Sequence, residues 1–179
     1  NPDFTVKPIA SLSNDFETLI DLYPDKPLFF YQYGYPSSAI CNSSDLLQRD
    51  FIATTFEIWD AHPTEIKGID FTWLHDLDPV IVDYWGDYYG LTDAIFLEYL
   101  RTIGLRTFDG MGNDKPAMRE LICQAVSHGF SDVDIDCNAT ITAGNIIESI
   151  TIYPNPVHNY FSIHPLPEAS NVPAGGYEF

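Results

Sequence analysis

Apolar side chains recur at helical spacing in four segments of the chain. Residues 14–23 carry Phe16, Leu19, Ile20 and Tyr23 at positions i, i+3, i+4 and i+7, the pattern of an amphipathic helix. The same spacing, with Ser, Asp, Pro or Gly at the ends, predicts three further helices, over residues 45–61, 93–103 and 115–128.

Two runs of strand length follow the first and the second of these predicted helices. Residues 27–33 and 66–74 are apolar and aromatic without regular alternation, which predicts strands buried on both faces, as in a parallel sheet. Residues 83–90 are rich in aromatic residues and glycine and are expected to form turns. The order helix, strand, helix, strand, helices is that of consecutive βα units, so the fold class is α/β with parallel neighbouring strands.

The last fifty residues have a different pattern. Residues 130–148 are polar, acidic and rich in small side chains, which indicates a linker or an edge segment. Residues 149–164 contain two alternating runs separated by Pro-Asn-Pro, which predicts two strands and a rigid turn, the start of a small all-β domain.

Length and charge narrow the class of protein. A chain of 179 residues with 45% hydrophobic side chains supports a folded core, but a complete eightfold barrel needs about 200 residues or more. The net charge of −18 argues against nucleic acid and anionic membrane surfaces as partners. No apolar run approaches the roughly 20 residues of a membrane span. Because the chain opens at Asn1 without a signal peptide, we expect a processed product or a piece of a longer protein.

The three cysteines show no metal-binding spacing. Cys41, Cys123 and Cys137 form no CxxC pair and have no histidine at ligand spacing, so neither a metal nor an organic cofactor is expected. Cys123 lies in a helical pattern, where a buried thiol is expected. Cys41 and Cys137 lie in polar loops and are candidates for pairing in an oxidising compartment.

The segment ITIYPNPVHNYFSI, residues 150–163, resembles the opening of the C-terminal sorting domain of the Bacteroidetes type IX secretion system. The resemblance implies export by the type IX secretion machinery to the cell surface or the medium. Such domains usually continue through further strands, so the copy over residues 149–179 is interpreted as truncated. The alternative is that Tyr-Pro-Asn-Pro is only a rigid turn between two strands.

The main body resembles the last quarter to third of clan A glycoside hydrolases, which are retaining (β/α)8, or TIM, barrels. The matching pieces are LFFYQYGYPSS as the seventh strand with its loop, FTWLHDLD as the eighth, and YYGL and TIGLRTFDG before the last helix. The resemblance implies that residues 1–129 are the last βα units of an incomplete TIM barrel. A linker over 130–148 and the truncated sorting domain would follow.

The resemblance places Gln32 where the clan has its nucleophilic glutamate, two residues before Gly34. Retaining enzymes need two carboxyl groups about 5 to 5.5 Å apart, and an amide supplies no anionic nucleophile. Three explanations are open: a laboratory substitution, a natural loss of catalysis that leaves a sugar-binding groove, or catalysis in which the substrate supplies the nucleophile. The clan's general acid belongs to the fourth strand, which nothing in this chain matches.

Substrate-binding candidates follow the two predicted strands. Trp73 matches an aromatic platform of the clan, and an indole face stacks well on a sugar ring; core packing is the alternative. Tyr35 would hold its loop over a groove, and His75 and Asp76 lie at the edge where barrel enzymes keep their sites, although the aspartate is equally suited to capping a loop. A cluster of four aromatic residues is suited to either a carbohydrate cleft or packing: Tyr84, Trp85, Tyr88 and Tyr89.

The expected function is therefore that of a secreted glycoside hydrolase or hydrolase-like protein acting on β-linked carbohydrate, inactive in this chain because of Gln32. The alternative is a non-catalytic carbohydrate-binding or surface-adhesion protein. A third possibility is a complete small α/β protein unrelated to a barrel, in which residues 1–129 fold alone with both sheet edges covered.

Overall fold

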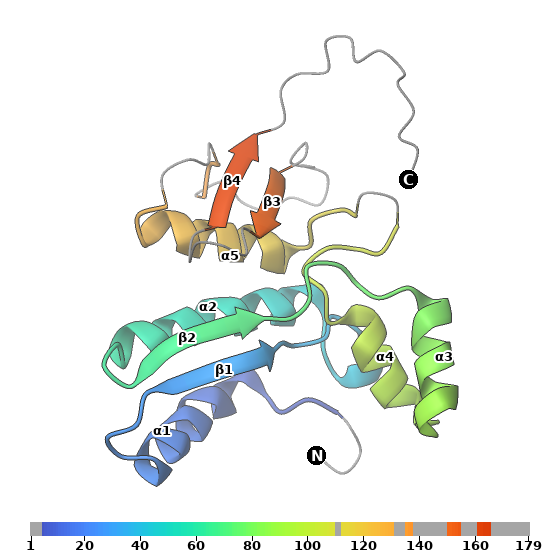
Figure 1. Cartoon of the computed structure of the whole chain (residues 1–179), viewed down its shortest axis with the longest axis horizontal. Helices are drawn as coiled ribbons and strands as arrows, with labels where there is room; N and C mark the ends of the chain where they lie inside the picture. Colours follow the sequence, from blue (N-terminus) through green and yellow to red (C-terminus); the bar gives the residue numbers. More distant parts are fainter. Residues whose placement is uncertain (1–4, 110–111, 131–134, 138–149, 155–160, 166–179) are drawn as a thin grey trace.

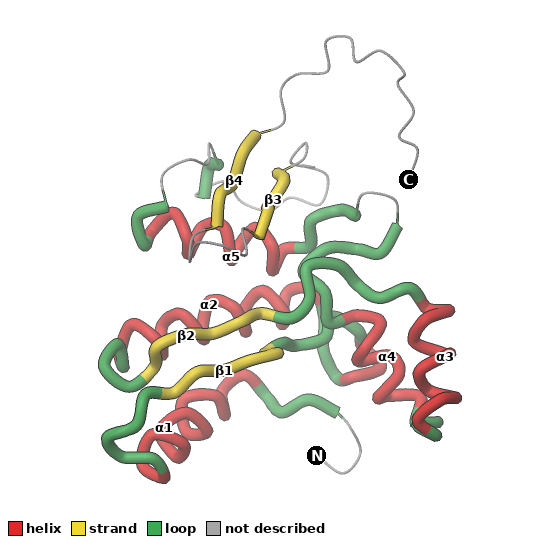
Figure 2. Tube along the Cα trace, viewed as in Figure 1, coloured by secondary structure: helices red, strands yellow, loops and turns green. Residues whose placement is uncertain are grey.

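The computed structural model describes residues 5–109, 112–130 and 135–137, together with the backbone of two strands near the C-terminus (Figure 2). The order of helices and strands in these residues is that of a mixed α/β chain. The elements are η1 (Ile9–Ser11), α1 (Leu12–Leu22), β1 (Leu28–Tyr33), η2 (Ala39–Cys41), α2 (Asp45–Ala61), β2 (Ile66–Phe71), α3 (Pro79–Tyr89), α4 (Ala94–Thr102), α5 (Pro116–Ser127), β3 (Ile150–Pro154) and β4 (Phe161–Pro165).

The two strands β1 and β2 pair in parallel, as the sequence predicts. Leu28 is opposite Ile66 and Tyr33 is opposite Phe71, and α2 makes the crossover between the two strands. Figure 1 shows both strands running toward α3 and α4, which lie beyond their carboxyl ends. The α/β class and the parallel pairing are thus confirmed.

Within the part of the chain that the structure describes, only one face of this sheet is covered. Phe16 of α1 and Ile58 of α2 form a buried cluster with Ile66 of β2, so both helices pack on the same side. On the opposite face, Phe29 is 54% exposed and Tyr31 is 75% exposed, and their rings stack with centroids 6.4 Å apart. The prediction that β1 is buried on both faces is therefore wrong for this chain, because no described element covers the second face.

The main core lies between α2, α5 and the loop that follows β1. Its buried members are Tyr35, Phe51, Ile52, Leu105, Ala117, Met118 and Ile122. Helix α2 begins where Ser44 accepts a hydrogen bond from the amide of Leu47, a standard N-cap. Gln48 is one of the buried residues of α2, and its amide nitrogen donates to the carbonyls of Tyr35 and Gly104.

Residues 79–89 form helix α3, where the sequence pattern predicts turns over residues 83–90. Asp78 caps the helix by accepting from the amide of Val80, Pro79 occupies the first turn, and Gly90 ends the helix in the left-handed conformation at φ 67°. This arrangement of Pro at the start and Gly just past the end is a helix signal. The density of aromatic side chains inside the segment obscured it.

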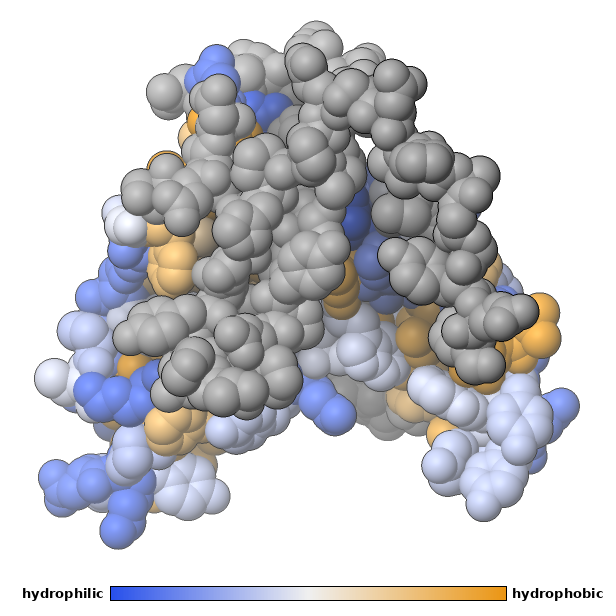
Figure 3. All heavy atoms as spheres, turned by 45° about the horizontal axis from the view of Figure 1, so that its top comes forward, coloured by the Kyte–Doolittle hydropathy of each residue, from blue (hydrophilic) through white to orange (hydrophobic). Residues whose placement is uncertain are grey.

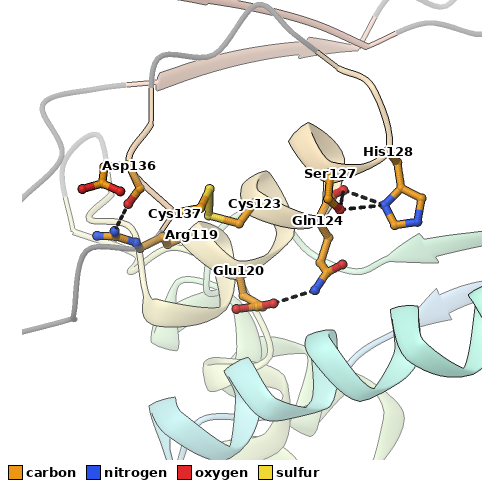
Figure 4. Close-up of a disulfide and its surroundings, with 8 residues drawn as sticks. All are labelled: Arg119, Glu120, Cys123, Gln124, Ser127, His128, Asp136 and Cys137. Carbon is orange, nitrogen blue, oxygen red and sulfur yellow. Dashed lines mark hydrogen bonds between the residues drawn. A yellow bond between two sulfur atoms is a disulfide. The ribbon is translucent and has the colours of Figure 1, made fainter.

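The disulfide is not the one between the two loop cysteines that the sequence pattern offers as candidates. Cys123 on α5 is bonded to Cys137, with Cα atoms 5.6 Å apart, and Cys41 is a buried free thiol. Figure 4 shows this bond and, beside it, Arg119 donating to the carbonyl of Asp136. Residues 135–137, which the sequence pattern assigns to a linker, are therefore fixed on α5, whereas residues 131–134 and 138–148 lie outside the described residues.

Strands β3 and β4 pair antiparallel, with Ile152 opposite Ile163, which confirms the two strands of the predicted hairpin. Its turn and residues 166–179 lie outside the described residues, so the sorting-domain assignment stays a prediction. In the described ranges no helix combines the length and the apolar character that crossing a membrane requires.

Candidate functional site

The carboxyl ends of β1 and β2 bring two of the predicted site residues to the same edge. The amide of Thr72 donates to the carbonyl of Tyr33 at 3.0 Å, so the two strands stay hydrogen-bonded up to this point. Gln32 directly precedes Tyr33 and Trp73 directly follows Thr72. We call the surface formed by Gln32, Trp73 and the loops after them the strand-end edge.

Gln32 interrupts the regular strand. Its φ is 56°, in the left-handed region that side-chain-bearing residues seldom adopt, and the pairing register shifts between Phe30 and Tyr33. As a result Tyr31 and Gln32 are both exposed although they are neighbours, whereas Tyr33 points back into the core. Unfavourable backbone conformations held by their surroundings cluster at functional sites.

The turn after Gln32 has no room for a side chain, which accounts for the glycine at position 34. A Cβ atom at this position would lie 2.6 Å from the carbonyl oxygen of Thr72 and 2.7 Å from Cδ1 of Ile103. Backbone from the ends of both strands thus meets at the glycine. The close approach fixes the loop after β1 against the end of β2.

Tyr35 lies in the core and not on a surface. It is 7% exposed, its ring stacks on Phe51 at a centroid distance of 5.0 Å, and its hydroxyl donates to the carbonyl of Lys7 at 2.9 Å. The burial raises the pKa of this phenol. Tyr35 therefore anchors the loop after β1 to the core, and its ring offers no face for a sugar.

Trp73 follows β2 through a cis peptide bond with Thr72. Its side chain is half-buried, with the ring centroid 6.3 Å from that of Trp85 on α3. Its carbonyl accepts from the amide of Leu105 at 3.0 Å. One part of the indole is packed and the rest remains accessible, which is the arrangement of an aromatic platform.

Asp76 is taken up by a buried ion pair. Its Oδ1 lies 2.6 Å from Nζ of Lys115, which also donates to the hydroxyl of Ser37 and the carbonyl of Gly104 at 3.1 and 2.9 Å. Burial raises the pKa of this carboxyl, although Lys115 opposes the shift. Asp76 thus ties together the loops after β1, β2 and α4, a structural task that sequence reasoning weighed only as loop capping.

His75 lies in the extension of β2, where it forms a parallel bridge with Arg106. The amide of Asp76 donates to the carbonyl of Arg106, and the amide of Arg106 to the carbonyl of Leu74. The imidazole lies against Gly112, where a Cβ atom would approach its Cδ2 to 2.5 Å. The ring is half-buried and belongs to the outer part of the strand-end edge.

Sequence reasoning missed Lys115 as a residue of this edge. It is 6% exposed and holds three loops together from the N-terminal end of α5. The signal available was weak: a lone lysine before a helix-starting proline, in a chain with only 8 basic residues. Lysine is almost never fully buried unless paired, and the partner in the chain is 39 residues away.

The chain was compared with protein families, with curated proteins and with solved structures, and it matches none of them. In the part of the chain that the structure describes, no three His, Cys, Asp or Glu side chains gather into a possible metal site. The chemistry of the edge therefore has to be argued from its own residues.

Proposed function

We propose that this chain binds neutral β-linked carbohydrate at the strand-end edge, without nucleophilic catalysis, as part of a secreted protein related to the glycoside hydrolases. The observation that carries the proposal is that an exposed, left-handed Gln32 and a half-buried Trp73 lie at the carboxyl ends of adjacent parallel strands. Ligand sites of parallel α/β folds lie at this end of the strands.

The one-sided sheet supports descent from a barrel. In a (β/α)8 barrel the helices cover the outer face of each strand and the inner face is filled by side chains from the other strands. Helices α1 and α2 cover one face here, whereas Phe29 and Tyr31 expose an aromatic pair on the other. Two strands of a larger closed sheet are expected to show this asymmetry. A complete small α/β protein has no reason to keep such a face open.

The chemistry of position 32 supports binding without turnover. A primary amide donates two hydrogen bonds and accepts two, so Gln32 is well suited to the hydroxyl groups of a sugar. It carries no negative charge and therefore forms no glycosyl-enzyme intermediate by the retaining mechanism. The amide is thus proposed to hold the sugar that a glutamate at this position would attack.

Charge supports an uncharged ligand. The chain carries 26 acidic against 8 basic residues, and the two cations described next to the edge, Lys115 and Arg106, are already paired with Asp76 and Asp114. An anionic sugar would meet repulsion without a compensating cation. Neutral hydroxyl-rich rings, which stack on indole through their C–H faces, meet none.

Secretion is proposed on two independent features. The Cys123–Cys137 disulfide is typical of proteins that fold in an oxidising compartment. The Tyr-Pro-Asn-Pro segment resembles a type IX sorting signal, and the strands β3 and β4 pair antiparallel. The bond and the hairpin lie in different parts of the chain, so each supports export by itself.

A titration with neutral β-linked oligosaccharides tests the proposal. Binding of glucan, mannan, xylan and galactan fragments is followed by calorimetry, with Trp73→Leu as the test variant. Leucine keeps apolar bulk against Trp85 but removes the indole face, so binding should weaken about tenfold. Tyr23→Ala, which truncates a 54% exposed ring at the end of α1, is the control and should bind as the unsubstituted chain does.

A further inference from the structure

Helix α3 carries a second aromatic surface that the strand-end edge does not include. Tyr84, Tyr88 and Tyr89 are 64%, 69% and 66% exposed. The rings of Tyr84 and Tyr88, one turn apart, stack with centroids 6.2 Å apart, and Tyr88 meets Tyr89 edge to face at 4.8 Å. We call these three residues the α3 tyrosine surface. Figure 3 shows apolar and near-neutral side chains gathered at the lower right, in the region of α3 and α4.

The helix that bears this surface is firmly placed. Gly86 faces α4 so closely that a Cβ atom would lie 2.9 Å from the carbonyl of Leu91 and 3.0 Å from Cδ2 of Leu97. Asp83 of α3 pairs with Arg101 of α4, and Val82 is completely buried. The tyrosines are therefore presented by a preorganised support, which lowers the entropy cost of binding.

Helix α3 also contacts the strand-end edge. Trp85 lies on the same helix, and its ring centroid is 6.3 Å from that of Trp73. The Trp73–Trp85 pair thus connects the ends of the strands with the helix that bears the α3 tyrosine surface. A ligand longer than one or two sugar units would be able to leave the edge in this direction.

The charges around the surface select the kind of ligand. Asp83 and Asp87 lie on the same helix, and the single basic residue of α3 and α4 is Arg101, which is paired with Asp83 and lies 3.7 Å from Glu98. An anionic polymer or nucleic acid finds no available cation here. Phenol hydroxyls and carboxylates do, however, offer hydrogen bonds to the hydroxyl groups of a neutral polymer.

We propose that the α3 tyrosine surface is a second carbohydrate-binding site, which holds the neutral β-linked polysaccharide chain whose end or bend occupies the strand-end edge. Tyr84 and Tyr88 stack on successive sugar rings, and the Trp73–Trp85 pair connects this site to the edge. The class of ligand in this inference rests on the proposed function. The inference adds a separate site, which binds sugar units of a long chain beyond those at the strand-end edge.

Affinity electrophoresis tests the proposal with the 179-residue chain. Native gels contain soluble neutral glucan, mannan, xylan or galactan, or polygalacturonate as the anionic comparison, and the test variant is Tyr84→Ala/Tyr88→Ala. The expected result is retardation by a neutral polysaccharide and about tenfold weaker binding of the polymer by the variant, because two aromatic contacts are lost. Tyr23→Ala controls for the loss of an exposed tyrosine.

A disaccharide of the retarding polymer separates the two proposals. It should bind the Tyr84→Ala/Tyr88→Ala variant as tightly as the unsubstituted chain, because it fills only the strand-end edge. Equal polymer affinity of variant and unsubstituted chain overturns the second site alone. Absence of binding to every neutral sugar overturns the proposed function. Self-association that the double substitution abolishes, seen by sedimentation velocity without polymer binding, identifies a second copy as the occupant and overturns the second site.

Discussion

Nζ of Lys115 lies 2.6 Å from Oδ1 of Asp76, and the two side chains are 6% and 12% exposed. The pair joins the first residues of α5 to the loop after β2 and, through Ser37, to the loop after β1. A buried charge pair therefore joins the loops that carry the candidate site.

Lys115→Met is expected to lower the free energy of unfolding by about 3 kcal/mol, because it leaves the Asp76 carboxylate buried without a cation. Urea denaturation measures this change. The additional substitution Asp76→Asn should recover part of the loss, since it removes the unpaired charge. Lys7→Met is the matched control: it removes an ion pair with Asp15 whose side chains are 57% and 37% exposed and should cost at most about 1 kcal/mol. Equal losses for the two lysines would contradict the role assigned to Lys115.

The disulfide is expected to contribute about 3 kcal/mol, the value of the loop-entropy estimate for a closed loop of roughly this size, since its cysteines are 14 residues apart. Cys123→Ser and Cys137→Ser should each lose this amount, and the double variant should lose no more than either single one. Alkylation of the denatured, unreduced chain should label one thiol, Cys41, and labelling after reduction should reach all three. Additive losses, or three labels without reduction, would show that the bond is not formed.

The pH dependence of stability should include a contribution from His128 at the end of α5. Its Nε2 lies 2.8 Å from Oδ1 of Asp60 and its Nδ1 lies 2.7 Å from the carbonyl of Gln124, a contact drawn in Figure 4. The hydrogen bond to Asp60 raises the pKa of this imidazole above its ordinary value of 6.5. Since the folded state binds the proton more tightly, the stabilisation is complete below pH 6.5 and is lost as the pH rises through the folded pKa.

His128→Gln and Asp60→Asn should each remove this contribution. Both variants should be less stable than the unsubstituted chain at about pH 5.5, by less than ~1 kcal/mol because the pair is exposed, and of nearly equal stability to it at about pH 8.5. Chemical denaturation at the two pH values checks this. A larger loss at the higher pH would reverse the sign and refute the assignment.

The left-handed backbone of Gln32 predicts an unusual substitution profile. Gln32→Gly should be tolerated, because glycine adopts a φ of 56° without steric cost. Gln32→Val should cost about 1 to 2 kcal/mol, because a β-branched side chain is strongly disfavoured there. In an ordinary exposed strand position the order is reversed, since valine favours strands and glycine weakens them. Thermal unfolding of the two variants shows which order holds.

Local sequence patterns predicted where helices and strands form better than they predicted how these elements pack. The periodicity of residues 45–61 predicted both ends of α2 correctly. Both signals, the amphipathic stripe and the Ser44 cap, depend only on residues that are close together in the sequence. The one-sided burial of β1 and the burial of Lys115 depend on which elements pack across the sheet and on a partner 39 residues away, which local spacing does not encode. The pairing of Cys123 with Cys137 likewise depends on how the chain turns back after α5.

For the candidate site, the sequence placed residues at the ends of two adjacent strands but assigned the same role to residues with different tasks. Gln32 and Trp73 lie at one edge, as the parallel order requires. Tyr35 and Asp76 were predicted for the same edge. Tyr35 lies in the core, where its hydroxyl is hydrogen-bonded, and Asp76 forms a buried ion pair. Alternation along a strand predicts a side chain's face only while the strand is regular, and the register shift at Gln32 ends that regularity.

A parallel measurement of binding and hydrolysis on one oligosaccharide shows whether the strand-end edge recognises a neutral β-linked sugar without cleaving it. We expect a dissociation constant of about 1 mM or lower, a loss of affinity in Trp73→Leu, and no release of reducing ends above the uncatalysed rate. Release of reducing ends by the chain with Gln32 in place, abolished by Gln32→Ala, would contradict this expectation.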